Sequence, residues 1–99
     1  MPEFTNPFSG NAPAQNMTLN DLIRAIRLDI AAEHEAVNIY TAQADATDNA
    51  LAKKVLLDVA NEEREHVGEF MRLLQVLTGD EDKWIASGVE EVKEMEAEI

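Results

Sequence analysis

The sequence predicts an all-α protein in which an antiparallel two-helix hairpin pairs with a second copy to form a four-helix bundle, followed by short C-terminal helices. Three observations favour this fold class. Apolar residues recur every three or four positions through two long stretches. A cluster of turn-forming residues separates the stretches. A chain of 99 residues forms one small domain, and a single hairpin cannot cover both of its apolar stripes.

Composition narrows the classes of function. The net charge is −12, from 20 acidic and 8 basic residues, so the surface repels nucleic-acid phosphates and attracts cations. There is no cysteine, which excludes disulfides and thiolate metal ligands. No apolar run approaches membrane-spanning length, and the first residues lack the pattern of a signal peptide. These features predict a cytoplasmic protein that binds neither nucleic acid nor membrane.

The chain divides into three parts. Residues 1–17 hold all three prolines and almost no charge, which predicts a flexible N-terminal arm. Residues 18–78 carry the two apolar stripes and form the expected helical hairpin. Residues 79–99 form an acidic C-terminal segment, with one short helix expected over 80–87 and another over 89–99. Trp84 is expected to anchor the shorter of these helices by packing.

The first helix begins with a capping box, "TLND", in which Thr18 is the N-cap and Asp21 lies three residues later. The turn "DATDN" (45–49) ends it. Residues on one face of this helix recur at steps of three, four or seven: Leu19, Ile23, Ile26, Ile30, Val37, Tyr40 and Ala44.

The second helix begins near Ala50 and ends at Thr78–Gly79, where glycine suits a left-handed C-terminal position. Its expected apolar face is made of Leu56, Val59, Phe70, Leu73 and Leu77.

Ionisable residues interrupt both apolar faces. Glu33 occupies such a position on the first helix, and Glu63 and His66 occupy consecutive ones on the second. An unpaired buried carboxylate costs several kcal/mol. A domain of this size has a total stability of only about 5–10 kcal/mol. A bound cation is the simplest compensation.

The spacing indicates which kind of metal site this is. Glu63-x-x-His66 places both side chains one turn apart on the same face, so that both can reach one metal. Di-iron carboxylate bundles use one Glu from each of two helices and Glu-x-x-His from each of the other two. This chain holds one of each, so two chains complete the site. Four carboxylates and two neutral imidazoles balance two divalent ions, and these ligands suit iron or manganese, with zinc or calcium as alternatives.

The alternative without a metal is a shifted stripe, in which a neighbouring line of apolar residues on the first helix faces the core. If Leu22, Ala25 and Leu28 faced inward, Glu33 would lie at the rim in contact with water. His34 points about 100° away from Glu33 and is expected to be exposed, as a candidate for a transient metal contact. Tyr40 lies two turns after Glu33, where it either hydrogen-bonds a metal ligand or packs as a half-buried core residue.

Two segments together carry a resemblance to a known family. "AAEHEAVNIY" (31–40) and "LLDVANEEREHVGEFMRLL" (56–74) resemble the encapsulated ferritins, which are two-helix ferritin-like proteins housed in encapsulin nanocompartments. The likeness runs from about residue 19 to 78 and reaches into "EEVKE" (90–94). The resemblance rests on two motifs, E-x-x-A-(V/I)-x-x-Y and E-E-x-x-H. Together they are fairly specific for this family, and either one alone is weak evidence.

The resemblance implies a ferroxidase that oxidises Fe(II) to Fe(III) with dioxygen for iron storage. It implies two irons per subunit dimer, held at the interface by Glu33, Glu63 and His66 of each chain, with Tyr40 beside them as part of the catalytic site. It also implies an annular decamer of five dimers. The encapsulin shell protein would be the partner, with the chain as its cargo or as a domain fused to it, inside the nanocompartment.

The sequence departs from the family pattern in three places. Ile39 stands where many members have tryptophan. An outer metal site uses a second acidic residue at the position of Ala32, so only Glu35, with His34 beside it, remains for such a site. The chain ends "EMEAEI" rather than in a short apolar docking peptide.

Two other functions remain open at this stage. One is a non-enzymatic acidic helical domain that dimerises and binds a basic partner, with a structural metal only. The other is a peroxide-reducing di-iron protein like rubrerythrin, which needs an electron route. The absence of cysteine rules out a rubredoxin centre in this chain and counts against that function.

Overall fold

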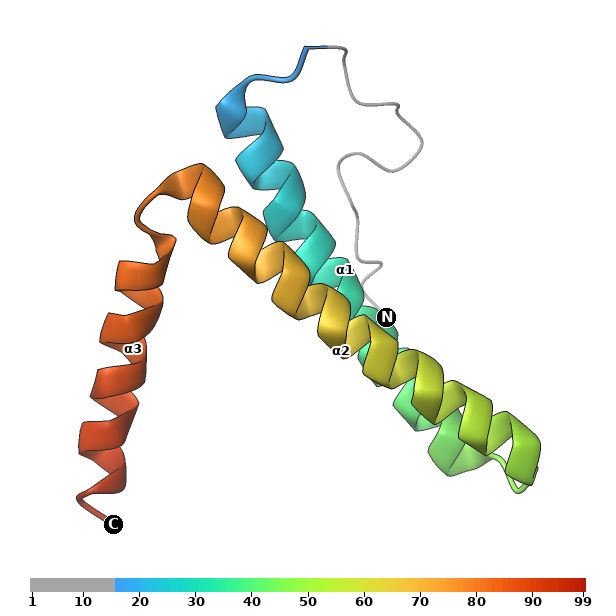
Figure 1. The fold of residues 1–99 in the computed structure, drawn as a ribbon. Helices are drawn as coiled ribbons and strands as arrows, with labels where there is room; N and C mark the ends of the chain where they lie inside the picture. Colours follow the sequence, from blue (N-terminus) through green and yellow to red (C-terminus); the bar gives the residue numbers. More distant parts are fainter. Residues whose placement is uncertain (1–15) are drawn as a thin grey trace, which may run out of the picture.

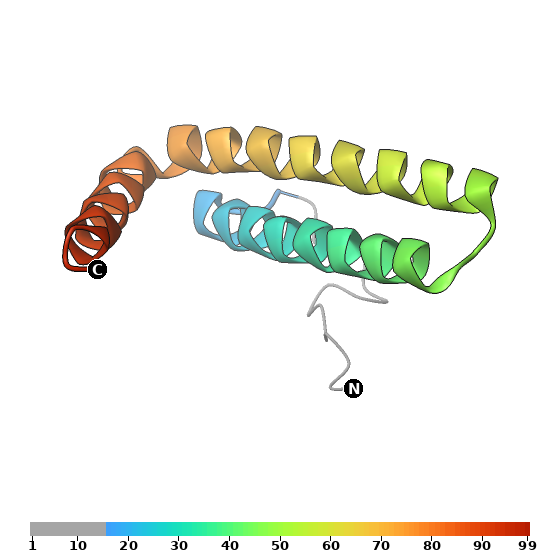
Figure 2. The same ribbon diagram turned by 90° about the horizontal axis from the view of Figure 1, so that it is seen from below.

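A computed structural model describes residues 16–99, and within this range the protein is entirely helical. Two long helices, α1 (Leu19–Ala46) and α2 (Ala50–Thr78), run antiparallel and side by side (Figures 1 and 2). A third helix, α3 (Glu81–Glu96), leaves the end of α2 and projects away from the hairpin (Figure 1). The all-α hairpin expected from the sequence is confirmed. The predicted N-terminal arm lies outside the described residues except for Asn16 and Met17.

Local signals in the sequence set the helix ends. The Thr18 hydroxyl accepts a hydrogen bond from the Asp21 N–H at 3.1 Å, and the Asp21 carboxylate accepts one from the Thr18 N–H at 3.3 Å, so the predicted capping box is present. The Asn49 side chain caps α2 by accepting a bond from the Ala52 N–H at 2.9 Å. Gly79 ends α2 with a φ of 76°, the left-handed conformation that glycine adopts without steric cost.

The contact between α1 and α2 has a narrow core. Ile26 and Ala44 on α1, and Ala60 and Leu74 on α2, are the fully buried apolar residues among those described. The two alanines let the helix backbones approach closely. Ile26 and Ala44 belong to the face predicted for α1. On α2 the buried line was missed, because Ala60 and Leu74 lie beside the predicted stripe rather than within it.

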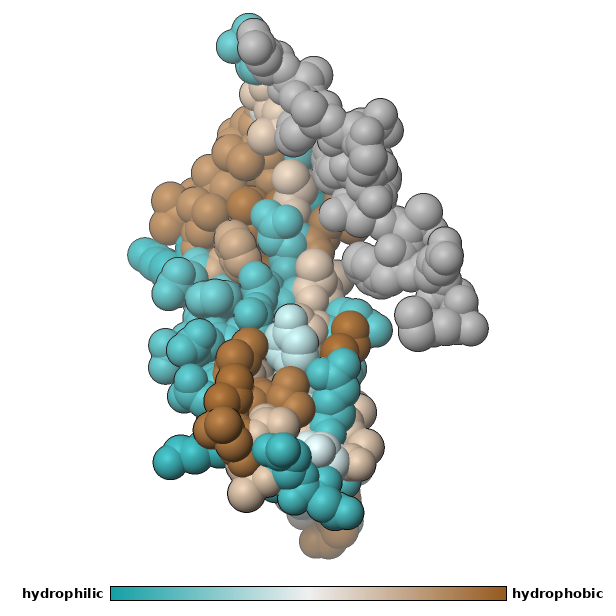
Figure 3. Space-filling view, turned by 90° about the vertical axis from the view of Figure 1, so that its right-hand side faces the viewer, coloured by the Kyte–Doolittle hydropathy of each residue, from teal (hydrophilic) through white to brown (hydrophobic). Residues whose placement is uncertain are grey.

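The predicted stripe of α2 is only partly covered by α1. Of its predicted members, Leu73 is 39% exposed and the other four are half-buried: Leu56, Val59, Phe70 and Leu77. Val55, which was not predicted to belong to the stripe, lies in line with it and is 51% exposed. These residues recur at helical spacing, so they form one line along the edge of the hairpin. Apolar side chains also reach the surface between hydrophilic ones in the space-filling view (Figure 3). A single hairpin therefore leaves apolar surface for a second copy to cover.

The C-terminal segment differs from the sequence-based expectation. Residues 80–87 and 89–99 were expected to form separate helices, but α3 runs without a break through Gly88 to Glu96. Trp84 does not anchor it by packing within the chain, since this side chain is 62% exposed. Its indole N–H instead donates a hydrogen bond to the Asp80 carboxylate at 3.2 Å.

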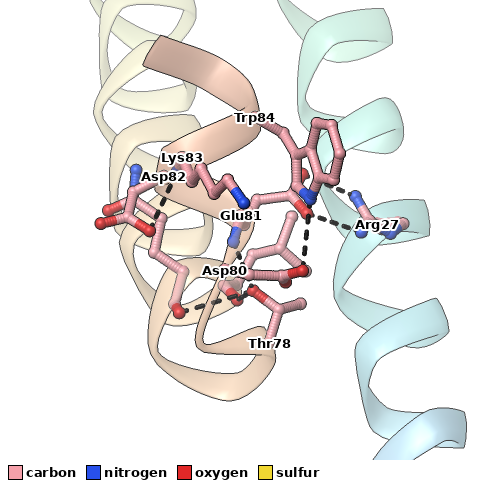
Figure 4. Close-up of polar contacts among 9 residues, drawn as sticks. Arg27, Thr78, Asp80, Glu81, Asp82, Lys83 and Trp84 are labelled. Carbon is pink, nitrogen blue, oxygen red and sulfur yellow. Dashed lines mark hydrogen bonds and ion pairs between the residues drawn. The ribbon is translucent and has the colours of Figure 1, made fainter. Parts of the chain in front are cut away.

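An ion pair joins the start of α3 to α1. The Arg27 guanidinium donates two hydrogen bonds to the Glu81 carboxylate, at 2.8 and 2.9 Å (Figure 4). These bonds lower the pKa of Glu81 and raise that of Arg27. The Thr78 hydroxyl, at the end of α2, accepts a bond from the N–H of Glu81, the first residue of α3, at 3.1 Å. The junction is therefore held by polar contacts from both long helices.

None of the helices in residues 16–99 combines the length and the apolar character needed to cross a membrane.

Candidate metal centre

Three ionisable side chains meet between the middle parts of α1 and α2. Glu33 comes from α1, and Glu63 and His66 lie one turn apart on α2. The His66 Nδ1 atom is 3.4 Å from Glu63 Oε2 and 3.6 Å from Glu33 Oε2. One ligand atom from each residue lies within 4.8 Å of the others, which is close enough for all three to contact one ion. The structure thus brings together the three residues singled out from the sequence.

The cluster is open on one side. The Glu33 and Glu63 side chains are 21% and 19% exposed, and His66 is 46% exposed. The position of Glu33, which faces α2 and lies 3.6 Å from His66, favours the metal-site interpretation over the shifted stripe, although Leu22, Ala25 and Leu28 are half-buried as well. Two carboxylates held beside one imidazole form an acidic cluster that is partly exposed in the single chain.

The donor set fits a hard or borderline divalent cation. Neither Glu33 nor Glu63 pairs with a lysine or arginine in residues 16–99, so no basic side chain there neutralises the two carboxylates. Carboxylate oxygen and imidazole nitrogen are ligands that iron, manganese and zinc accept. Within the described part of the chain, this is the only group of three or more such residues with ligand atoms so close together.

The cluster in one chain has the composition of half of a di-iron carboxylate site. Such bundles need four glutamates and two histidines, and the cluster contains two glutamates and one histidine. The missing half has the composition of a second copy of the same cluster. The partial exposure of the cluster and of the apolar edge of α2 is compatible with the approach of such a copy.

The other candidate residues lie outside the cluster. Tyr40 is half-buried on α1, and within the described residues its hydroxyl makes no hydrogen bond to Glu33, Glu63 or His66. Its predicted role beside the metal stays a prediction. His34 is exposed, as expected, and Glu35 is half-buried on the same helix. Neither belongs to a cluster of three ligands in residues 16–99, so the outer site also stays a prediction.

Sequence comparison places the chain among known proteins. The family model described as Rubrerythrin matches residues 25–99. The encapsulin nanocompartment cargo protein EncC of Myxococcus xanthus is 43% identical over 93 residues, which cover 94% of this chain and 70% of the relative. The ferritin-like-encapsulin shell fusion protein of Pyrococcus furiosus is 44% identical over 78 residues. That match covers 79% of this chain but only 23% of the fusion protein.

Comparison with solved structures supports the same family assignment. The encapsulated ferritin domain from Pyrococcus furiosus, known from its crystal structure, matches with a TM-score of 0.80 and 41% sequence identity. The match covers 91% of both chains. The chain therefore belongs to the rubrerythrin family of ferritin-like proteins and, within it, to the encapsulated ferritins.

Proposed function

We propose that this protein is a ferroxidase, which oxidises Fe(II) to Fe(III) with dioxygen at a di-iron site shared between two subunits. The observation that carries the proposal is the cluster of Glu33, Glu63 and His66, with all three ligand atoms within 4.8 Å of one another. The cluster is half of the donor set that di-iron carboxylate bundles use. Membership of a ferritin-like family supports iron as the metal.

The side chains have distinct roles in this proposal. Glu33 and Glu63 supply oxygen ligands that favour the harder Fe(III) product over Fe(II). Glu63 and the nitrogen ligand His66 share a helical turn, so both would hold metal from the same face of α2. Iron held by these residues would supply one electron per Fe(II), so that two Fe(II) and two protons would reduce one dioxygen to hydrogen peroxide. Two copies of the cluster bring four carboxylate charges, which balance two divalent ions.

The wider setting is also a proposal. Relatives of this chain are named as encapsulin cargo and as a fusion with an encapsulin shell. We propose that this chain likewise works inside an encapsulin nanocompartment, as cargo or as a fused domain, and passes Fe(III) to storage there. The assembly would be a ring of metal-sharing dimers, an annular decamer in its simplest form.

An iron-oxidation assay that begins with metal-free protein tests the proposed activity. Fe(II) is added anaerobically to the apoprotein, air is admitted, and Fe(III) absorbance is followed against autoxidation in buffer. The proposed site predicts fast turnover in the wild type and turnover near the buffer rate in Glu63→Ala. Glu62→Ala is the matched control, because it removes the same charge from an exposed neighbour. It should keep the wild-type rate.

Two results would decide against the proposal. Wild-type turnover in Glu63→Ala would remove the site assignment. Stoichiometric metal binding with no oxidation above the buffer rate would leave the metal structural and the protein a helical scaffold.

A further inference from the structure

Helix α1 carries a second apolar face on the side that points away from α2, which we call the far face. Its members recur at helical spacing, within about 40° of the direction opposite the buried Ile26. They are Leu28, Ala31, Glu35, Ile39, Ala42 and Ala46. Only one of the six is charged. A helix that is apolar on two opposite sides is typical of one that is covered on both.

The described helices leave much of the far face uncovered. Helix α2 lies along the other side of α1 (Figure 2), and α3 meets α1 through the Arg27–Glu81 pair. Ile39 is 43% exposed and Ala42 is exposed, while Leu28 is half-buried. The cover of the far face is therefore not one of these helices.

A second copy at the metal centre would not provide this cover. Glu33 marks the side of α1 that faces the cluster. At about 100° per residue, Leu28 and Ile39 lie about 140° and 120° around the helix from Glu33. A copy that completes the cluster is thus on a different side of α1 from the far face.

Residues 1–15 have the composition to cover an apolar face. They contain two of the three phenylalanines of the chain, Phe4 and Phe8, together with three prolines. Proline lacks a backbone N–H, so a segment rich in it leaves fewer donors unsatisfied when it lies against a helix. Glu3 is the only charged side chain of the segment, whereas the whole chain carries a net charge of −12. The segment can therefore approach α1 without the repulsion that a second acidic copy would meet.

The same segment can reach the far face from the start of α1. At about 1.5 Å per residue, Leu28 lies about 15 Å along the helix from the N-cap Thr18, and Ile39 lies about 32 Å from it. An extended chain spans about 3.3 Å per residue, so Phe8 can lie up to about 33 Å from Thr18, and Phe4 up to about 46 Å. Both phenylalanines can therefore contact the far face between Leu28 and Ile39.

The backbone turns just before α1 begins. Asn16 has a φ of 63°, and it is the only residue other than glycine with a positive φ in the described part of the chain. Asparagine adopts this left-handed conformation more readily than most residues do. The turn lies two residues before the N-cap Thr18. A segment that returns along α1 has to change direction at this point.

We propose that residues 1–15 fold back along α1 of their own chain and cover the far face. Phe4 and Phe8 pack on it between Leu28 and Ile39. The contact is made within one chain and on a different side of α1 from the metal cluster. It therefore does not obstruct the second copy that completes the proposed site.

Thiol labelling tests this cover, because the chain contains no native cysteine. Ala31→Cys places one thiol on the far face of the full chain, and its rate of reaction with a thiol reagent reports how often the face is open. Phe4→Ser combined with Phe8→Ser should speed this reaction by about tenfold, which corresponds to about 1.4 kcal/mol of lost contact. Leucine at both positions should leave the rate close to that of the parent, because leucine keeps an apolar side chain.

The matched control is Ala86→Cys, which places the thiol at an exposed position on α3. Its labelling rate should be the same with phenylalanine, leucine or serine at residues 4 and 8. An equal rise at residue 86 would mean that the serine substitutions loosen the whole chain, and it would overturn the proposal.

Refolding of mixed chains distinguishes the segment of the same chain from that of a neighbour. The Ala31→Cys chain with serine at residues 4 and 8 is refolded together with an excess of wild-type chain. The proposal predicts fast labelling, because each wild-type segment covers only its own α1. Slow labelling in the mixture would show that another copy supplies the cover and would overturn the proposal.

The serine substitutions also decide whether the far face is covered by something else. A labelling rate at residue 31 that does not respond to them would overturn the proposal, whether the face is bare or covered by a second copy. Labelling is measured without added iron, so these results do not depend on the metal centre.

Discussion

Glu33 and Glu63 face each other across the hairpin without a basic side chain beside them in the described residues. Charged carboxylates are unfavourable on a helix face whose other side chains are apolar and buried, unless they are paired or bind a cation. His66 contributes a nitrogen that can ligate a metal only in its neutral form. The cluster is therefore better suited to holding a cation than to stabilising the empty hairpin.

Replacement of His66 should weaken metal binding. In His66→Ala, we expect the affinity for Co(II), used as a spectroscopic substitute for Fe(II), to fall by at least about tenfold, since loss of a partner outside the ligand shell alone costs about 10–100-fold. Cobalt titration followed by visible absorbance measures this. The control is His34→Ala, which removes the only other histidine from an exposed position. Equal affinities in the two variants would contradict the role of His66.

Capping residues explain where α1 begins and where α2 begins and ends. Thr18, Asn49 and Gly79 each satisfy backbone groups that a helix leaves free at its ends. The hairpin has few fully buried residues, so these caps form a substantial part of what stabilises each helix. At this scale the α3 junction differs, because it depends on a long-range ion pair rather than on a local cap.

Removal of the first cap should destabilise α1. Thr18→Ala is expected to lower the free energy of unfolding by about 1 kcal/mol, since an N-cap hydroxyl contributes roughly that amount. Thermal unfolding followed by circular dichroism measures the change. Thr18→Ser should restore most of the lost stability, because it keeps the hydroxyl. A Ser variant as unstable as the Ala variant would show that the side-chain cap is not the cause.

The Arg27–Glu81 pair should make the α3 junction sensitive to acid. The pKa of Glu81 is lowered in the folded state, so its contribution is fully present above the unfolded pKa of about 4.3 and is lost as the pH falls through the lower folded value. Wild type and Glu81→Gln should therefore differ in stability at neutral pH and converge in strong acid. Fluorescence of Trp84, the single tryptophan and a neighbour of the junction, reports the change.

The matched control for this pH dependence is Glu90→Gln. Glu90 pairs with Lys93 on the exposed surface of α3 at 3.3 Å, and both side chains are more than 60% exposed. Such a pair contributes little. A difference between wild type and Glu81→Gln that persists unchanged in strong acid would contradict the assignment to Glu81.

At the scale of the whole molecule, the proposed function requires two copies of the chain. One chain brings together three candidate metal ligands, and its apolar edge on α2 is left partly uncovered. Each copy also carries a net charge of −12, which opposes association. In the proposed dimer, bound metal would offset part of that repulsion by adding positive charge at the contact between copies.

Metal should therefore stabilise the assembled protein. Divalent metal at 100 times its dissociation constant should raise the free energy of unfolding by about 2.7 kcal/mol, and the melting temperature should increase with protein concentration. Melting of apo and Co(II)-loaded protein at several concentrations measures both effects. Glu33→Gln should lose most of the stabilisation by metal while its apo form remains helical. A metal effect of the same size in Glu33→Gln would argue against the site.

The sequence by itself determined the hairpin, the capping box at Thr18, the glycine end of α2 at Gly79 and the identity of the three clustered residues. Those features depend on contacts within a few turns of helix, where spacing alone specifies which side chains share a face. The tertiary structure decided which line of α2 is buried against α1, because Ala60 and Leu74 are chosen by the fit between two helices. It also decided the direction of α3, since the Arg27–Glu81 pair joins residues far apart in the chain and no local pattern encodes such a contact.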